Sequence, residues 1–319
     1  MTVPKLTKKI ALMGILLAIE AATAICSGQP SLPDGPTVSV VVTVTGSGAQ
    51  APGVADKANV LVYQNHQRRP ITSWVRATGQ PAPLELSLLV DESLGPAFNT
   101  LLPDLRQFIR GLPASARVAV VYSTNSNANF VQQFTTDHGK AARALRLPLG
   151  AAAGNLSIYF AAQDLMKRWP DQSGSWRRTV LVVSDGIDTY HGASDSSPGN
   201  NADLSAAIRA FLRHGVIAYT LYASGASSAS QNSFLVNNGQ SCLTLLARET
   251  GGAAFFEGLK TPVSFRPFLG RMNKLFSSQY VLSFKAMPRA KAGLEPISVT
   301  SELPDVHINA PKEVWAPGR

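Results

Sequence analysis

Hydrophobic residues gather in two short runs that stop abruptly at an aspartate. Residues 86–90, apolar except for Ser87, and residues 180–183, apolar at every position, lead into Asp91 and, one serine later, Asp185. A strand that is apolar on both faces is typical of a parallel sheet covered by helices on both sides. In open α/β sheets, ligands bind at the carboxyl ends of the strands. The pattern therefore predicts that Asp91 and Asp185 meet at one edge of a buried sheet.

From residue 84 onward, predicted strands and helices alternate, and several helical patterns end at a glycine or a proline. This alternation is typical of a doubly wound, mostly parallel, Rossmann-like α/β sheet. The spacing predicts helices at residues 98–112, 140–147, 157–169, 202–214, 242–249 and 265–276. Further strands are predicted at residues 117–123, 129–134, 216–222, 253–256 and 279–284.

The segments on either side of this region read as β structure. Residues 38–45 alternate and are rich in β-branched side chains, which favours a strand. Shorter strand patterns follow at 59–63, 71–75, 297–301 and 306–309. We therefore predict a linker and small β extension at residues 25–80, an α/β domain at 84–285 and a C-terminal β tail at 286–319.

The first 24 residues have the pattern of a secretory signal peptide. Lysines precede an apolar run at 10–19, and Ala22-Thr23-Ala24 fits a cleavage site. The run is short for a membrane span, so we expect a secreted or periplasmic protein with no stable span after cleavage; an uncleaved anchor is the alternative. In an oxidising compartment Cys26 and Cys242 can form a disulfide, or both can be unpaired thiols with Cys242 buried in a helix.

Composition and charge narrow the class of partner. Hydrophobic residues make up 45% of the chain, enough for a buried core, and the formal net charge is +9. Cleavage after residue 24 removes three lysines and one glutamate and leaves a charge of +7. The basic residues are scattered along the chain, which is typical of solvated faces. We therefore expect no nucleic acid as a partner.

The residues that follow the first buried strand have metal-ligand chemistry. Asp91 is followed two residues later by Ser93 and two further on by Gly95, so alternate positions of this loop can point at one centre. Carboxylate and hydroxyl oxygens suit Mg²⁺ or Mn²⁺, and Asp185 can add a second carboxylate through a water. The alternative is that these aspartates only cap a helix or begin a turn.

The strand with its DESLG loop, the segment TVLVVSDGID and the tail pattern TGG followed by QYVL resemble a von Willebrand factor A (vWA) domain. More narrowly, the chain is similar to the bacterial VWFA-related, acidobacterial-type family. The likeness extends upstream through ADKANVLVYQNHQRRPITSW and covers most of the chain after the signal peptide. The resemblance implies a Rossmann-like vWA fold and a protein-binding or adhesion function.

In that family a metal-ion-dependent adhesion site combines Asp-x-Ser-x-Ser, a threonine from a later loop and an aspartate from a further strand. The resemblance therefore implies Asp91, Ser93 and Asp185 as metal ligands. Gly95 stands where the second serine belongs, and Leu156 stands where the threonine belongs. Asn155 or Ser157 can replace the threonine only if the loop shifts by one residue. A site with these departures binds Mg²⁺ or Mn²⁺ weakly, through waters.

Other chemistry finds little support in the chain. It has no G-x-S-x-G elbow, no phosphate-binding glycine loop and no histidine pair at metal-ligand spacing, so we expect no enzymatic activity. Two polar loops, 189–203 and 224–240, follow strands and should share the edge with Asp91. Within the second loop, Phe234, Leu235 and Val236 are an apolar patch that marks a contact surface or tucks inward.

The predicted function is binding of another protein, in the envelope or outside the cell, through the Asp91 edge. If a metal is present, an acidic side chain of the partner would complete its coordination, as the family resemblance implies. The alternatives are a metal-free vWA scaffold for envelope assembly and a metal-dependent hydrolase that uses Asp91.

Overall fold

The computed structural model describes residues 1–2, 35–46, 56–79, 82–150, 157–170 and 176–318. Residues 3–24 of the predicted signal peptide, Cys26, Asn155 and Leu156 lie outside these ranges. The chain divides into Met1–Pro33 and Asp34–Arg319, and the helices and strands given below belong to the second unit. No helix in the described ranges has the length and apolar character needed to cross a membrane.

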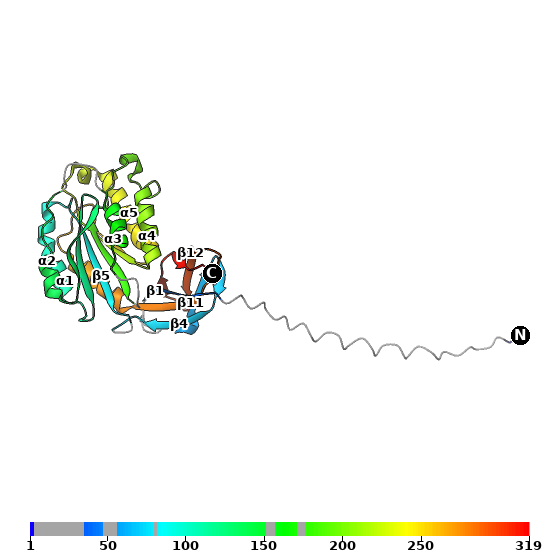
Figure 1. Ribbon diagram of the computed structural model, residues 1–319. Coiled ribbons are helices and arrows are strands. Elements are labelled where there is room, and N and C mark those ends of the chain that lie inside the picture. Colours follow the sequence, from blue (N-terminus) through cyan, green and yellow to red (C-terminus); the bar gives the residue numbers. More distant parts are fainter. Residues whose placement is uncertain (3–34, 47–55, 80–81, 151–156, 171–175, 319) are drawn as a thin grey trace. The chain divides into compact units, whose positions relative to one another are not determined.

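A six-stranded sheet forms the centre of the α/β domain (Figure 1). Its strands lie in the order β10-β9-β8-β5-β6-β7, and β7 alone runs antiparallel to its neighbour. The chain therefore starts at the centre, winds to one side and then returns to the other, as a doubly wound sheet does. The bounds are β5 (Leu84–Asp91), β6 (Arg117–Thr124), β7 (Asn127–Thr135), β8 (Arg177–Ser184), β9 (Ile217–Tyr222) and β10 (Ala254–Phe255).

Six α-helices of the described ranges cover the two faces of this sheet. On β5, Leu88 and Val90 belong to a core formed with α1, α2 and α6, whereas Leu89 belongs to a core formed with α3, α4 and α5. Every residue of β5 is therefore buried, which explains why apolar residues occupy both faces of the strand. The helices are α1 (Leu102–Arg110), α2 (His138–Ala144), α3 (Ile158–Lys167), α4 (Ala202–His214), α5 (Ser233–Glu249) and α6 (Arg266–Ser277).

Short 3₁₀ turns and side-chain caps begin several of these elements. Ser157 caps α3, Asn201 caps α4 and Asn232 caps α5, each through a side-chain oxygen that accepts a backbone N–H of the first turn. The 3₁₀ turns are η1 (Lys57–Asn59), η2 (Pro96–Leu101), η3 (Ala193–Ser196) and η4 (Ser228–Gln231).

Helix α5 corrects the prediction that residues 224–240 form a loop and that the helix begins at 242. The helix begins at Ser233, because Asn232 accepts hydrogen bonds from the amides of Phe234 and Leu235. Its first turns bury only two large apolar side chains, Leu235 and Val236, which hides the helical period in the sequence. A side chain at Gly239 would overlap the carbonyl oxygen of Asp185, so this glycine lets α5 approach the turn that follows β8.

The remaining strands form two four-stranded sheets with a core of their own, including Val42, Val62 and Leu282. Residues 279–284, which the sequence placed in the α/β domain, lie here in β11, paired antiparallel with β1 and β4. The orders are β13-β1-β11-β4 and β14-β12-β2-β3. The strands are β1 (Thr37–Gly46), β2 (Val60–Gln64), β3 (Gln67–Arg69), β4 (Ile71–Arg76), β11 (Gln279–Lys285), β12 (Gly293–Ser301), β13 (Val306–Asn309) and β14 (Glu313–Ala316).

A buried arginine ties the start of β8 to α6 and β11. Arg177 donates hydrogen bonds to the carbonyl oxygens of Ala82 (2.8 Å) and Phe276 (3.0 Å) and to Oε1 of Gln279 (2.8 Å). Burial lowers the pKa of Arg177 to about 10, so the guanidinium remains charged at neutral pH. The arginine therefore fixes the base of the sheet, at the end away from Asp91.

Candidate functional site

Asp91 and Asp185 lie at the carboxyl edge of adjacent parallel strands. Val90 on β5 is level with Val183 on β8, so Asp91 is level with Ser184 and Asp185 follows directly. Both aspartates are buried, with 7% and 4% of their surface exposed. The apolar strands on either side thus bring two carboxyl groups together where little water reaches them.

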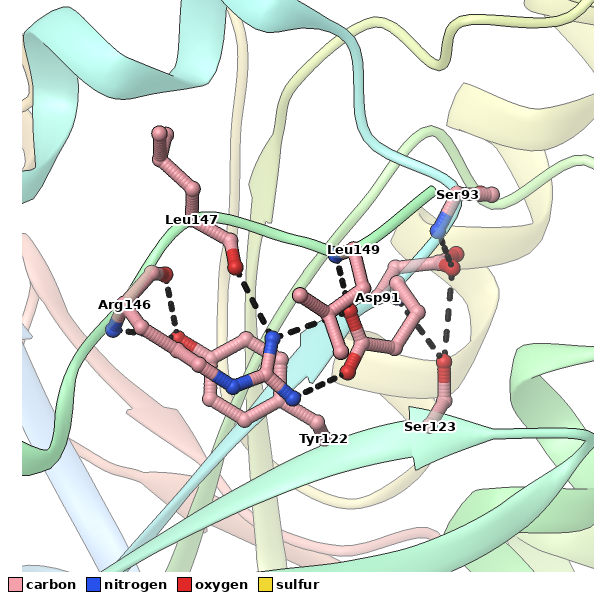
Figure 2. Close-up of polar contacts among 8 residues, drawn as sticks. Asp91, Ser93, Tyr122, Ser123, Arg146, Leu147 and Leu149 are labelled. Atoms are coloured by element: carbon pink, nitrogen blue, oxygen red, sulfur yellow. Dashed lines mark hydrogen bonds and ion pairs between the residues drawn. The ribbon is translucent and has the colours of Figure 1, made fainter. Parts of the chain in front are cut away.

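Three groups hold the Asp91 carboxylate. Its Oδ2 accepts a hydrogen bond from the Ser184 hydroxyl (2.6 Å), and its Oδ1 accepts from the Ser93 amide (2.9 Å) and the Ser123 hydroxyl (3.3 Å). Figure 2 shows the contacts of Ser93 and Ser123 with this carboxylate. Ser123 lies opposite Asp91 on β6. Sequence reasoning missed Ser123 and Ser184, although each is a polar residue near the end of an otherwise apolar strand.

Asp185 is held by the turn η4. Its Oδ2 accepts a hydrogen bond from the Ser230 hydroxyl (2.7 Å), and its Oδ1 accepts from the Ile187 amide (3.0 Å). Burial, together with the nearby charge of Asp91, raises the pKa of Asp185 to about 7. Nothing in the sequence pairs Ser230 with Asp185, because 45 residues separate them.

Two backbone hydrogen bonds join the DESLG loop to the 224–226 loop beside both aspartates. The amide of Gly95 donates to the Ser224 carbonyl (3.0 Å), and the amide of Ala226 donates to the Ser93 carbonyl (2.8 Å). A side chain at Gly225 would overlap the Asp185 carboxylate, and a Cβ at Gly95 would lie only 3.3 Å from the Gly225 carbonyl oxygen. Both glycines therefore allow the DESLG loop and the 224–226 loop to lie in contact.

Glu92 faces a different partner. Its carboxylate pairs with Arg146 and accepts the amide of Leu149 (2.7 Å), and the Arg146 guanidinium lies 4.1 Å from the centre of the Tyr122 ring (Figure 2). The Tyr122 hydroxyl in turn donates to the Arg146 carbonyl (2.6 Å). These contacts hold residues 146–149 against the DESLG loop. They do not involve the Asp91 carboxylate, which accepts its hydrogen bonds from Ser93, Ser123 and Ser184.

The central sheet and the motif at its edge identify the fold. The order β10-β9-β8-β5-β6-β7, with β7 antiparallel, places the Asp-x-Ser motif at the end of the first and central strand. The α/β domain has a von Willebrand factor A-type fold. The narrower likeness to the acidobacterial-type family stays a prediction.

Comparison with known proteins found resemblance only among solved structures; no family model and no curated protein sequence matches the chain. BatB from Bacteroides thetaiotaomicron is 12% identical, with 61% of this chain and 97% of that chain covered and a TM-score of 0.45. An aerotolerance-related membrane protein from Bacteroides fragilis is 14% identical, with 60% and 98% covered and a TM-score of 0.42. The SpRpn10 VWA domain is 11% identical, with 57% and 97% covered and a TM-score of 0.39.

The vWA-type edge can be tested for its fit to a divalent cation. Serine hydroxyls and backbone amides already engage the carboxylate oxygens of Asp91 and Asp185, and the loop at Gly225 packs against the second of them. Within the described ranges, no three His, Cys, Asp or Glu side chains are grouped to hold a metal ion. This arrangement does not fit a cation held directly by both carboxylates. Asp91, Ser93 and Asp185 as ligands of Mg²⁺ or Mn²⁺ therefore stay a prediction.

Ser157 does not take the place of the missing threonine ligand. Its hydroxyl donates to Oδ2 of Asp188 (2.8 Å) and accepts the amide of Tyr159 at the start of α3. Asp188 Oδ2 also accepts from the Asn201 side chain (3.3 Å), so the 189–203 loop is tied to the first turns of α3 and α4. These contacts support the loop rather than a ligand site.

The carboxyl edge of the vWA-type domain carries exposed apolar side chains. Of the predicted patch at 234–236, Phe234 is 60% exposed, while Leu235 and Val236 are buried in α5 packing. Loops at the same edge expose further large apolar residues, so the patch has a different composition from the one expected. Seven of the ten exposed large apolar residues in the described ranges lie on these loops or at the start of α5: Leu147, Leu149, Tyr190, Phe234, Phe256, Leu259 and Val263.

Proposed function

We propose that this protein is a non-enzymatic protein-binding module of the cell envelope or extracellular space, which contacts its partner through the carboxyl edge of the vWA-type domain without a divalent cation. The proposed location rests on the signal-peptide pattern of residues 1–24. The partner would be another protein with an apolar contact surface.

The observation that carries the proposal is the contrast between the base and the rim of this edge. At the base, Asp91 and Asp185 are buried and hydrogen bonded; at the rim, Leu149 is 81% exposed and Phe234 is 60% exposed. Isolated exposed apolar residues are ordinary, but their concentration on the loops of one edge is typical of a contact surface. Loops on a rigid scaffold are also where binding residues concentrate.

Metal independence is supported by the donors that surround the carboxylates. Each hydrogen bond to a charged group stabilises the fold by about 1.5–3 kcal/mol, and a cation would have to displace those from Ser184 and Ser230. The same contacts support a non-enzymatic role, since Asp91 is engaged by its neighbours rather than directed at an open pocket.

The test is retention of proteins from an envelope extract on the immobilised chain. A variant carrying Leu149→Ser and Phe234→Ser should lose the specifically retained protein. A matched variant with Val75→Ser and Val131→Ser, two exposed apolar residues on β4 and β7, should retain it. Retention should be equal in EDTA and in Mg²⁺. Loss of retention in EDTA would favour the metal-dependent prediction, and equal retention by both variants would refute the proposed surface.

A further inference from the structure

A groove of about 480 Å³ lies at the opposite end of the sheet from Asp91. It is bounded by β1, by the end of α4, by the first residues of β8 and β9 and by β14. This volume lies within the range of small-molecule sites, which is about 300–1,000 Å³. Because the groove lies at the opposite end of the sheet, it is separate from the edge to which the proposed function is assigned.

The walls of the groove are more apolar than polar and include two indole rings. Trp176 and Trp315 line it together with valines from three elements, and prolines close the end near β14. Aromatic and aliphatic walls favour a ligand with a flat or extended apolar body, whose burial provides most of the binding free energy. Such walls alone do not select among apolar ligands.

The charges at the groove select an anion. Arg178 and Arg213 line it, against Glu313 as the single acidic residue of the lining. Arg178 donates to the His214 carbonyl (3.4 Å) at the C-terminus of α4, which offsets the negative end of the helix dipole there, and it also pairs with the buried Glu85 (4.0 Å). The charge that remains to attract an anion is therefore that of Arg213.

Arg213 is the residue placed to bind that anion. Its guanidinium lies 5.1 Å from the centre of the Trp315 ring. Among the described residues it has no hydrogen-bond or ion-pair partner besides this ring contact. Stacking on the indole holds the side chain at the groove and leaves its N–H groups available, and guanidinium N–H groups bind carboxylates and sulfonates through paired hydrogen bonds.

We propose that this groove binds an amphipathic organic anion, with its apolar body between the indoles and the valines and its carboxylate or sulfonate on Arg213. The site is independent of the carboxyl edge, and its occupation does not require the proposed protein partner.

The test uses 8-anilinonaphthalene-1-sulfonate as the probe and the uncharged N-phenyl-1-naphthylamine as its matched control. Tryptophan excitation reports binding, because Trp176 and Trp315 transfer energy to a probe in the groove. Arg213→Gln should weaken sulfonate binding about tenfold, the loss expected for a charge-assisted hydrogen bond, and leave the amine unchanged. Arg271→Gln removes a comparable arginine stacked on Phe255 in the same fold and should change neither affinity.

A second variant tests the cavity itself. Thr37→Phe adds a ring at an exposed position of β1 that lines the groove, so it should weaken binding of both probes. Every variant keeps residues 10–19, so any probe binding to this apolar run is the same in all of them. Unchanged circular dichroism shows that each variant is folded. Equal sulfonate affinity of the wild type and Arg213→Gln, or probe binding unaffected by Thr37→Phe, would overturn the proposal. So would an absence of saturable binding to the wild type.

Discussion

Ser230→Ala tests whether the hydroxyl network at the carboxyl edge holds the fold. Ser230 is 9% exposed, and its hydroxyl donates to the nearly inaccessible Asp185 carboxylate at 2.7 Å. At pH 8, where Asp185 is ionised, removing a hydrogen bond to this charged group costs about 2 kcal/mol. At roughly 2–4 °C per kcal/mol for a domain of this size, the melting temperature should fall by about 4–8 °C. Ser228→Ala, at an exposed position of the same turn, is the matched control and should change stability by less than about 0.5 kcal/mol.

The loss should depend on pH in a defined direction. Burial and the nearby Asp91 raise the pKa of Asp185 from its ordinary value of 3.8 to about 7 in the folded protein, so between these values the unfolded chain is ionised while the folded chain keeps the proton. Its contribution to the free energy of unfolding therefore falls as pH rises from about 4 to about 7. The Ser230 hydroxyl favours the ionised form, so Ser230→Ala should cost more at pH 8 than at pH 5. Urea unfolding at both values measures this difference, and an equal cost at both would refute the reasoning.

Four further outcomes follow from contacts within the structure. Arg177→Met should lower the free energy of unfolding by about 4 kcal/mol, measured in urea, because it leaves buried acceptors unpaired at the base of the sheet. Gly95→Ser should cost about 1–2 kcal/mol because its Cβ meets the Gly225 carbonyl, and it should create no Mg²⁺ site detectable by calorimetry. Calorimetric titration of the wild type with Mg²⁺ or Mn²⁺ should give no saturable heat; heat lost in Asp91→Ala would restore the metal prediction. Burial would raise the pKa of Asp104, but hydrogen bonds from Ser264 and Arg266 outweigh burial and lower this pKa. The stability of the wild type should therefore fall as the pH drops through the pKa of the folded state. Asp104→Asn should flatten this pH dependence, measured in thermal melts.

The central sheet could be predicted from the sequence because its pattern is local and strong. Burial on both faces leaves residues 88–90 of β5 and 180–183 of β8 apolar without a break, and an aspartate close behind each run marks the same edge. The serine partners could not be predicted, because a single serine in a loop such as Ser230 has no pattern that assigns it to Asp185. Periodicity also left the sheet of β11 undetermined, since alternation predicts a strand but not its neighbour. The start of α5 was hidden because its first turns bury few residues beyond Leu235 and Val236.

The carboxyl edge combines a rigid base with apolar tips, and this combination has thermodynamic consequences for binding. Ser184 and Ser230 tie the strand ends and η4 to the buried aspartates, so the loops that carry Leu149 and Phe234 are attached to fixed points. Preorganised loops lose little entropy on binding, so the affinity would come mainly from the apolar area that the partner covers. Such binding gives a negative heat-capacity change and depends weakly on salt and chelator, whereas coordination of a partner's carboxylate by a cation would depend on both. In the proposed function, affinity would therefore come from apolar surface rather than from charge, because the serine hydroxyls already satisfy the carboxylates within the fold.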